Sequence, residues 1–414
     1  MRSERLLRAL GTVVKSPRII FLVALTARVW VLSQLLPAQA WSHFYRYNEP
    51  SRIAWALVSG FGFSSPWPNT PLSPTAQQPP IYPLLLAAIF KIAGAYSYWS
   101  LEIAVGLNAV FSALTAVLIF QIGKRDFGVP VGVLAAWIWS VWLYEAVVSI
   151  RLWESSLSAL LLAVGLWLLP ELVRSTRPWR WLIFGALAGV AALTNTTLLS
   201  VFPFFWLWLW TCCRRRGHSC GKWLAASVAV CLLVVLPWTL RNYRAFNQLV
   251  PIRDNFGLEL WLGNHGGVTH VFDNDFPILD PTEYNRLGET GFMKMKRNVA
   301  LEFIGRNPET FLRLSARRFF QFWSAPENSG WPALSLLAWM GMVLALLRKG
   351  LDAIPYALIV LIFPLVYYST HVFGTYRHPI EPAMLLLAAY AMVSAVTAIG
   401  LPLVQRRSIR DTAV

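Results

Sequence analysis

Carboxylate, arginine, amide and histidine side chains gather in a few short polar strings of an otherwise apolar sequence. The candidates for chemistry in these strings are Glu49, Glu154, Arg241, Asn242, His265 and Arg377. A carboxylate can act as a general base toward a hydroxyl, and arginine binds phosphate through a planar fork of donors. Together these residue types predict a site for a substrate with a phosphate head and an apolar tail, at the edge of a lipid bilayer.

Three of these candidates also have a purely structural interpretation. Glu49 can be a solvated loop acid or a charge at a helix N-terminus. Glu154 lies three residues after Arg151, and the two can form an ion pair. Arg241 follows an apolar block directly and fits an anchor at the membrane interface.

The remaining candidate residues also have both a functional and a structural interpretation. His265 precedes two glycines and fits a turn, and Arg377 stands four residues before Glu381, a spacing typical of a helical ion pair. Asp273 and Asp275 have the spacing found in metal-dependent sugar transferases, but short acidic turns are common. We therefore expect no cofactor, and a divalent metal stays an alternative that the sequence does not favour.

The composition indicates an integral membrane protein. The chain has 414 residues, of which 56% are hydrophobic and 14% charged, and a mean hydropathy of +0.51. A soluble domain carries about a quarter charged residues. The apolar residues form long blocks, and a block of about 20 such residues is enough to span a bilayer as a helix.

The net charge of +16 does not indicate nucleic-acid binding. The lysines and arginines stand in short clusters between apolar blocks, as they do in the cytoplasmic loops of membrane proteins. The cysteines lack a Cys-x-x-Cys pair, so zinc is not indicated. Thiols in a reducing loop explain Cys212, Cys213 and Cys220.

The distribution of basic clusters predicts an all-α polytopic protein, a single membrane domain over residues 1–414. About ten crossings put both termini in the cytoplasm and every basic cluster inside, provided that the apolar segment Ile81 to Tyr96 lies on the outer surface as a juxtamembrane helix. Val129 to Val148 is expected to form one span. In a bacterium this would be the inner membrane.

Two hydrophilic segments then face outward, residues 37–100 and the large loop 241–330. Asp280 followed by proline predicts a helix start in the large loop. Asn307 before Pro308 predicts a second helix that runs to Trp323, with apolar and basic faces suited to a membrane surface.

These strings resemble the GT-C superfamily of membrane glycosyltransferases, in a family-39-like branch similar to protein O-mannosyltransferases and lipid A aminoarabinose transferases. The matching strings are Glu49 followed by RIAWALVSGFGFSSPW, then PTAQQPPIYPLLLAAIF, PWTLRNY, DNFGLELWLGNH and YRHPIEP. They extend over most of the chain, and the first-loop pattern is the most specific of them.

The resemblance implies a sugar on a polyprenyl phosphate as the donor. Glu49 would take the proton of an acceptor hydroxyl, which attacks the anomeric carbon with inversion. Arg241 and Arg377 would hold the leaving phosphate. Asn242, Glu154, His265 and Tyr82 would contact substrate, and the acceptor, a lipid, glycan or protein, is not indicated.

Two other classes share this composition. A transporter or flippase for a lipid-linked sugar would often show repeated halves with broken helices, and the sequence has no internal repeat. A non-catalytic protein of the same fold would bind the lipid-linked sugar or a partner. The concentration of hydrophilic residues in two outer loops favours an enzyme over both of these classes.

Overall fold

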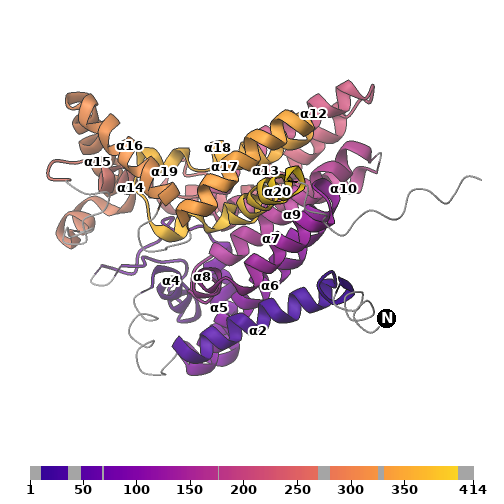
Figure 1. Cartoon of the computed structure of the whole chain (residues 1–414). Helices are drawn as coiled ribbons and strands as arrows, with labels where there is room; N and C mark the ends of the chain where they lie inside the picture. The colour runs from indigo at the N-terminus through magenta and orange to yellow at the C-terminus, as the bar shows by residue number, and fades with distance from the viewer. Residues whose placement is uncertain are drawn as a thin grey trace, which may run out of the picture.

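The computed structural model describes residues 11–35, 48–67, 70–175, 177–268, 280–324 and 331–399, and in these ranges the chain is helical (Figure 1). One group of helices forms the membrane bundle. Its members are α2 (Pro17–Leu35), α6 (Tyr98–Asp126), α7 (Val129–Val141), α8 (Leu143–Ser149), α9 (Ser155–Arg174), α10 (Pro178–Thr194), α11 (Thr196–Leu199), α12 (Phe202–Arg215), α13 (Gly221–Phe246), α17 (Trp331–Lys349), η1 (Gly350–Ala353), α18 (Ile354–Ile362), α19 (Leu365–Ser369), η2 (Gly374–Ile380) and α20 (Glu381–Ala398).

A second group lies at one end of the bundle (Figure 1). It consists of α4 (Glu49–Val58), α5 (Ile81–Ala93), α14 (Phe256–Gly263), α15 (Pro281–Arg306) and α16 (Pro308–Ser324). These helices belong to the two segments that the sequence predicts to be hydrophilic loops.

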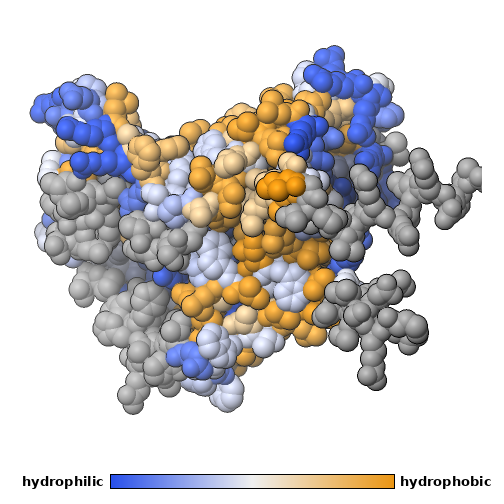
Figure 2. Space-filling model, in the orientation of Figure 1, coloured by the Kyte–Doolittle hydropathy of each residue, from blue (hydrophilic) through white to orange (hydrophobic). Residues whose placement is uncertain are grey.

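The predicted all-α membrane fold is confirmed. Seven helical stretches of the described residues are long and apolar enough to cross a bilayer, and an eighth if α7 and α8 form one broken span. The predicted count of about ten crossings is not confirmed. Figure 2 shows an apolar band across one face, with hydrophilic residues over α15 at one end and near the end of α12 at the other.

The short helix α5 agrees with its prediction, whereas the segment Val129 to Val148 is divided between two helices. The helix α5 has 13 residues and extends about 20 Å, which is less than the thickness of a bilayer core and agrees with the predicted short helix. The segment Val129 to Val148, expected to form one span, consists of two helices, α7 and α8, that together are apolar and long enough for one broken span. Trp142 adopts an extended conformation (φ −70°, ψ 116°), and α7 and α8 meet there at 62°. Neither proline nor glycine marks this break.

Small residues allow the bundle helices to approach one another closely. A Cβ atom on Gly123 of α6 would lie 2.5 Å from the Cα of Gly132 in α7, and one on Gly341 of α17 would lie 1.9 Å from the carbonyl oxygen of Leu387 in α20. Helices packed through small residues gain van der Waals contact without a hydrophobic driving force, as is usual in membranes. These contacts fix the frame on which the outer helices rest.

Helix starts in the large outer loop follow the sequence. Asp280 caps α15 by accepting hydrogen bonds from the backbone of Thr282 and Glu283, at 2.9 and 3.3 Å, and α16 begins at Pro308 as predicted. Asparagine or aspartate at this position satisfies backbone donors that the first helical turn leaves open. Helix α16 buries Arg318 completely and exposes Phe320.

Glu289 joins the large loop to the first loop. Its carboxylate accepts hydrogen bonds from the Thr75 hydroxyl (2.5 Å), the Ala76 amide (2.6 Å) and the Tyr284 hydroxyl (3.0 Å). Gly288, with a left-handed φ of 68°, kinks α15 directly before it, and a residue without Cβ adopts this conformation without strain. The residues after Thr75 are therefore held against α15.

Candidate functional site

A cavity of about 670 Å³ lies where the two outer segments meet the bundle. Its walls come from the start of α4, the turn between α8 and α9, the start of α11, residues 251–262, and the stretch between α19 and α20. Besides two tyrosines, its ionisable side chains are Glu49, Arg151, Glu154, Arg253, Glu259 and His371. The site therefore combines three carboxylates with two guanidiniums.

Glu49 is the first residue of α4, and its side chain lines the cavity. Asn48 precedes it with an extended backbone, and Pro50 fixes the first turn. The side-chain amide of Gln78 donates a hydrogen bond to the Glu49 carboxylate. Burial raises the pKa of the Glu49 carboxyl, whereas the charge of Arg253 and the hydrogen bond from Gln78 lower it. A carboxylate of raised pKa is a stronger base once it is ionised.

Glu154 is a second carboxylate in the same cavity. It occupies the position before the first residue of α9, where the helix N-terminus favours negative charge. Burial raises the pKa of Glu154 to about 7. The nearby charge of Glu49 raises the pKa of Glu154 further.

Arg151 is the most available cation of the cavity. Its side chain is exposed, and its guanidinium forms no hydrogen bond or ion pair with the residues that the structure describes. The backbone carbonyl of Arg151 is held by the Asn108 side chain at 2.7 Å. A fixed backbone and an uncommitted guanidinium suit the capture of a phosphate.

Arg253 lies between the carboxylates and is already engaged. Its Nε donates to the Gln77 carbonyl at 2.5 Å, and a terminal nitrogen lies 3.4 Å from Glu259. The other Glu259 oxygen lies 3.4 Å from Nδ1 of His371, whose Nε2 is 3.0 Å from the Tyr376 hydroxyl. This row of side chains forms one part of the cavity lining.

Sequence reasoning missed Arg253 and Glu259 as site residues. Glu259 stands in the string DNFGLELWLGNH, where it is the lone acid in an apolar helix, and that isolation is the signal that could have identified it. Arg253 had no such signal, because arginines are frequent in the large loop.

Arg241 and Asn242 lie outside the cavity lining. Arg241 donates hydrogen bonds to the carbonyls of Phe63 and Thr75, both at 2.6 Å, and Asn242 donates to those of Val250 and Ile252, at 3.0 and 3.3 Å. The two residues bind backbone rather than the cavity. Arg241 thus anchors the first loop, in agreement with the structural interpretation of that residue.

Tyr82 and His265 also lie outside the lining. The Tyr82 hydroxyl accepts a hydrogen bond from Asn108 at 2.9 Å. His265 stacks on Trp261 with ring centroids 4.5 Å apart, and its Nδ1 lies 2.9 Å from the Gly266 carbonyl oxygen. Of the predicted site residues, the structure brings together Glu49 and Glu154 in the cavity.

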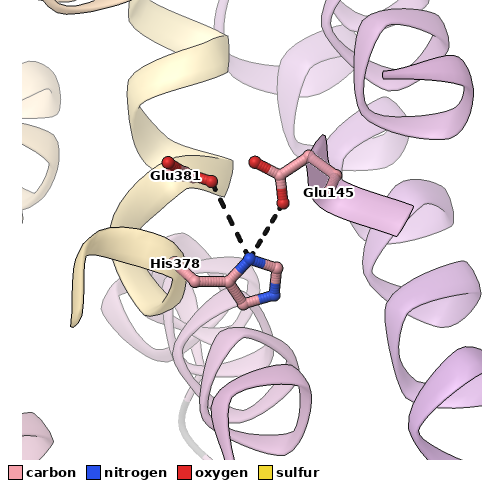
Figure 3. Close-up of side chains that lie close together, drawn as sticks. All are labelled: Glu145, His378 and Glu381. Atoms are coloured by element: carbon pink, nitrogen blue, oxygen red, sulfur yellow. Dashed lines mark ion pairs between the residues drawn. The ribbon is translucent and has the colours of Figure 1, made fainter. Parts of the chain in front are cut away.

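Arg377 belongs to a separate, fully buried cluster. It pairs with Glu381 at 2.9 Å and donates to the Ser335 hydroxyl at 2.8 Å. Next to this pair, Nδ1 of His378 lies 2.9 Å from Glu145 and 3.8 Å from Glu381 (Figure 3). All four ionisable side chains are at most 1% exposed, so Arg377 does not reach the cavity.

This buried cluster has ligand atoms that could hold a metal, but its charges oppose one. Glu145, His378 and Glu381 each offer one atom within 4.8 Å of the others. Arg377 pairs with Glu381, and Arg28 lies over the ring of Trp139, which also packs against His378. The two guanidiniums already balance the two carboxylates, and a divalent cation would leave a net charge of about +2 away from water. Asp273 and Asp275 lie outside the described residues.

The comparisons with known proteins agree with this architecture. A family model described as dolichyl-phosphate-mannose-protein mannosyltransferase matches residues 77–240, a range that includes Arg151 and Glu154 but not Glu49. No curated protein matches the chain by sequence.

Solved structures show a much more extensive likeness. ArnT from Cupriavidus metallidurans bound to undecaprenyl phosphate aligns with a TM-score of 0.53 at 14% identity, over 92% of this chain and 62% of that one. AglB, an oligosaccharyltransferase from Archaeoglobus fulgidus, in complex with an inhibitory peptide and a dolichol-phosphate, aligns with a TM-score of 0.54 at 12% identity, over 95% of this chain and 52% of that one. The apo form of the same organism's enzyme gives 0.56 at 11% identity, over 93% and 51%.

The chain therefore has the GT-C fold of integral membrane glycosyltransferases, and the superfamily resemblance predicted from the sequence is confirmed. It spans about half to three-fifths of the length of the solved proteins that it matches.

Proposed function

We propose that the protein transfers a sugar from a polyprenyl-phosphate donor to an acceptor hydroxyl in the Glu49 cavity. The observation that carries this proposal is the cavity itself, in which Glu49 and Glu154 from separate segments stand with the uncommitted guanidinium of Arg151. Such a site can accept a proton and balance a phosphate charge within one enclosed space. The lipids bound in two of the aligned structures, undecaprenyl phosphate in ArnT and a dolichol-phosphate in AglB, support this class of donor.

In the proposed reaction Glu49 is the general base. Its carboxylate accepts the proton of the acceptor hydroxyl as that oxygen attacks the anomeric carbon. The bond between the anomeric carbon and the phosphate oxygen breaks, and its electron pair leaves with the polyprenyl phosphate. Attack from the face opposite the leaving group inverts the anomeric centre.

Arg151 is the proposed partner of the departing phosphate, in place of Arg241 and Arg377. The leaving group gains negative charge as the bond breaks, and a guanidinium already in place stabilises that charge most in the transition state. Arg253 is held by Gln77 and Glu259, so it sets the local charge rather than moving to the substrate. Because the two arginines supply positive charge at this point, we propose a reaction that does not depend on a divalent metal.

We also propose that the cavity opens on the outer face of a bacterial inner membrane. The basic residues at the ends of α6, α9, α12 and α17 support a cytoplasmic location for the other face. Labelling of a cysteine at position 124 by an impermeant thiol reagent tests this orientation. Labelling in intact cells would place that end outside and contradict it.

The experiment that tests the function is transfer from radiolabelled polyprenyl-phosphate sugars in vesicles. Wild type is expected to release polyprenyl phosphate, and Glu49→Gln to be slower by about a hundredfold or more, because the amide keeps the shape but cannot take the proton. Glu309→Gln, an acid on α16 outside the cavity lining, is the matched control and should be fully active. Equal turnover by wild type and Glu49→Gln would remove Glu49 as the base, and binding without turnover in wild type would favour a transport or binding protein.

A further inference from the structure

A second cavity, of about 240 Å³, lies at the opposite end of the bundle. Its walls come from the end of α6, the end of α9, the end of α12 and the junction of α17, η1 and α18. Glu154 of the first cavity precedes α9, and Arg174 of the second ends it. The 20 residues of α9 extend about 30 Å, which is the thickness of a bilayer core. The two cavities therefore lie at opposite membrane surfaces.

One ion pair in the second cavity is already complete. Arg125 pairs with Asp126 through two contacts, at 2.6 and 2.9 Å, and donates to the Trp167 carbonyl at 2.6 Å. The Tyr356 hydroxyl donates to Oδ2 of Asp126 at 2.6 Å, the same oxygen that accepts from the Arg125 terminal nitrogen. These two residues satisfy each other and leave no net charge for a ligand.

The remaining ionisable side chains leave an excess of positive charge. Arg174, Arg216 and Lys349 line the cavity, with Asp352 as the remaining acid. Among the described residues, none of these four forms a hydrogen bond or an ion pair through its side chain, although Lys349 faces the rings of Phe127 and Tyr390. Three cations against one carboxylate leave about two charges that only an anion, or solvent, can balance.

The rest of the wall is apolar. Leu166, Leu169, Val173 and Trp208 line it together with Pro355. Close by, Arg214 lies over the ring of Trp210 at 4.8 Å, an arrangement suited to the interface between lipid and water. A cavity that is basic at its mouth and apolar along its wall, at the end of membrane helices, suits a ligand with an anionic head and a hydrocarbon tail.

We propose that this basic cavity binds the phosphate group of an anionic phospholipid from the leaflet opposite the Glu49 cavity. The phosphate lies among Arg174, Arg216 and Lys349, and the acyl chains leave toward the bilayer along the apolar wall. The bound lipid thereby neutralises three helix ends that converge on one point. This binding site is independent of the sugar transfer proposed above.

The test compares thermal unfolding of the purified full-length chain in zwitterionic nanodiscs of phosphatidylcholine, with and without added phosphatidylglycerol. The variant Arg216→Gln/Lys349→Gln removes two charges from the cavity. The matched control Arg215→Gln/Arg348→Gln removes the same charge from the adjacent residues, which do not line it. Phosphatidylglycerol should raise the midpoint of wild type and of the control, whereas the cavity variant should need on the order of tenfold more of it. Arg216→Lys/Lys349→Arg, which keeps both charges, should respond like wild type.

Two further measurements keep the proposal falsifiable if the cavity variant is unstable. Native mass spectrometry of wild type should retain phosphatidylglycerol in preference to phosphatidylcholine, and inorganic phosphate alone should not reproduce the stabilisation. An equal loss of response in the cavity and control variants would show that general surface charge is responsible, and would overturn the proposal. Full stabilisation by inorganic phosphate would also overturn it, in favour of a soluble phosphate compound.

Discussion

The side-chain amide of Gln78 donates a hydrogen bond to the carboxylate of Glu49. This contact connects the first residue of α4 with the segment before α5. The hydrogen bond favours the ionised form of the acid and lowers the pKa of Glu49 against the effect of burial. Gln78 is thus a positioning residue for the proposed base.

Replacement of Gln78 by leucine should therefore move the acidic limb of the pH–rate profile. Loss of the hydrogen bond raises the pKa of Glu49, and the fraction of ionised base falls at a given acidic pH. The limb should shift to higher pH, and kcat should fall by about tenfold at the acidic end. Measurement of sugar transfer between pH 4 and 9, about the range where carboxylates and histidines titrate, checks this. A uniform fall in rate with an unmoved limb would indicate that Gln78 is merely structural.

Arg151→Gln should weaken donor binding. Hydrogen bonds to charged groups contribute about 1.5–3 kcal/mol, so the KM for the polyprenyl-phosphate sugar should rise by roughly tenfold or more. The position of the acidic limb should stay close to that of wild type. Arg306→Gln, an exposed arginine on α15, is the control and should leave KM unchanged. An unchanged KM in Arg151→Gln would remove this residue from the phosphate site.

Arg241→Met should act on stability. Arg241 holds two carbonyls of the first loop, and its loss should lower the free energy of unfolding by about 2 kcal/mol. The KM for the donor should rise less than in Arg151→Gln. Denaturation in detergent, followed by tryptophan fluorescence, gives the first quantity and transfer kinetics the second. A large rise in KM at unchanged stability would restore Arg241 as a phosphate ligand.

Glu289 should make stability depend on pH. Burial raises the pKa of Glu289 from its ordinary 4.5 to about 7. Between these values the folded chain holds a proton that the unfolded chain has released, so stability is greatest below about pH 4.5, falls as the pH rises toward 7, and then levels off. Melting midpoints across this range should show the slope in wild type. Glu289→Gln should reduce the slope but not abolish it, because burial also raises the pKa of Glu154 to about 7, and a slope equal to that of wild type would contradict the assignment.

The buried pair of Arg377 and Glu381 should show strong coupling. Arg377→Met leaves an uncompensated carboxylate away from water and should cost about 3–5 kcal/mol. The double variant Arg377→Met/Glu381→Met removes both charges and should cost less than this single change. Unfolding free energies of the two variants and wild type provide the comparison. A double variant less stable than Arg377→Met would contradict this prediction. It would show that Glu381 stabilises the bundle through contacts other than its ion pair with Arg377.

The fold could be predicted from the sequence to the level of class, and several helix starts to the residue. Apolar length and basic clusters identify the membrane segments, and Asp280 before Pro281 fixes the start of α15. The break at Trp142 could not be predicted, because the residue has no backbone peculiarity of its own. Tertiary contacts of α7 and α8 with other helices decide its conformation.

The site could be predicted in part, and the reason lies in the chemistry of arginine. Glu49 is predicted from its place in the first outer loop and from the family resemblance, Glu154 from its place at the turn between two apolar blocks, and both line the cavity. Arg241 and Arg377 carry the same guanidinium as Arg151, yet they bind carbonyls and a carboxylate of their own chain. Sequence shows which residues can bind phosphate, but the folded neighbours determine which guanidinium is left without an internal partner.

Arg28 has a consequence for the order in which this protein is assembled. Its guanidinium binds the Ser112 hydroxyl of α6 and the carbonyls of Trp139 and Ser140 in α7. When α2 leaves the ribosome, none of these partners has been synthesised, and a lone arginine at mid-helix costs about 2.5–3.5 kcal/mol in lipid. The window of α2 also has the lowest hydropathy of the seven candidate spans, 1.3. We therefore expect α2 to stay at the insertion machinery until α6 and α7 arrive, so that the first candidate span of the described residues is among the last to be released into the bilayer.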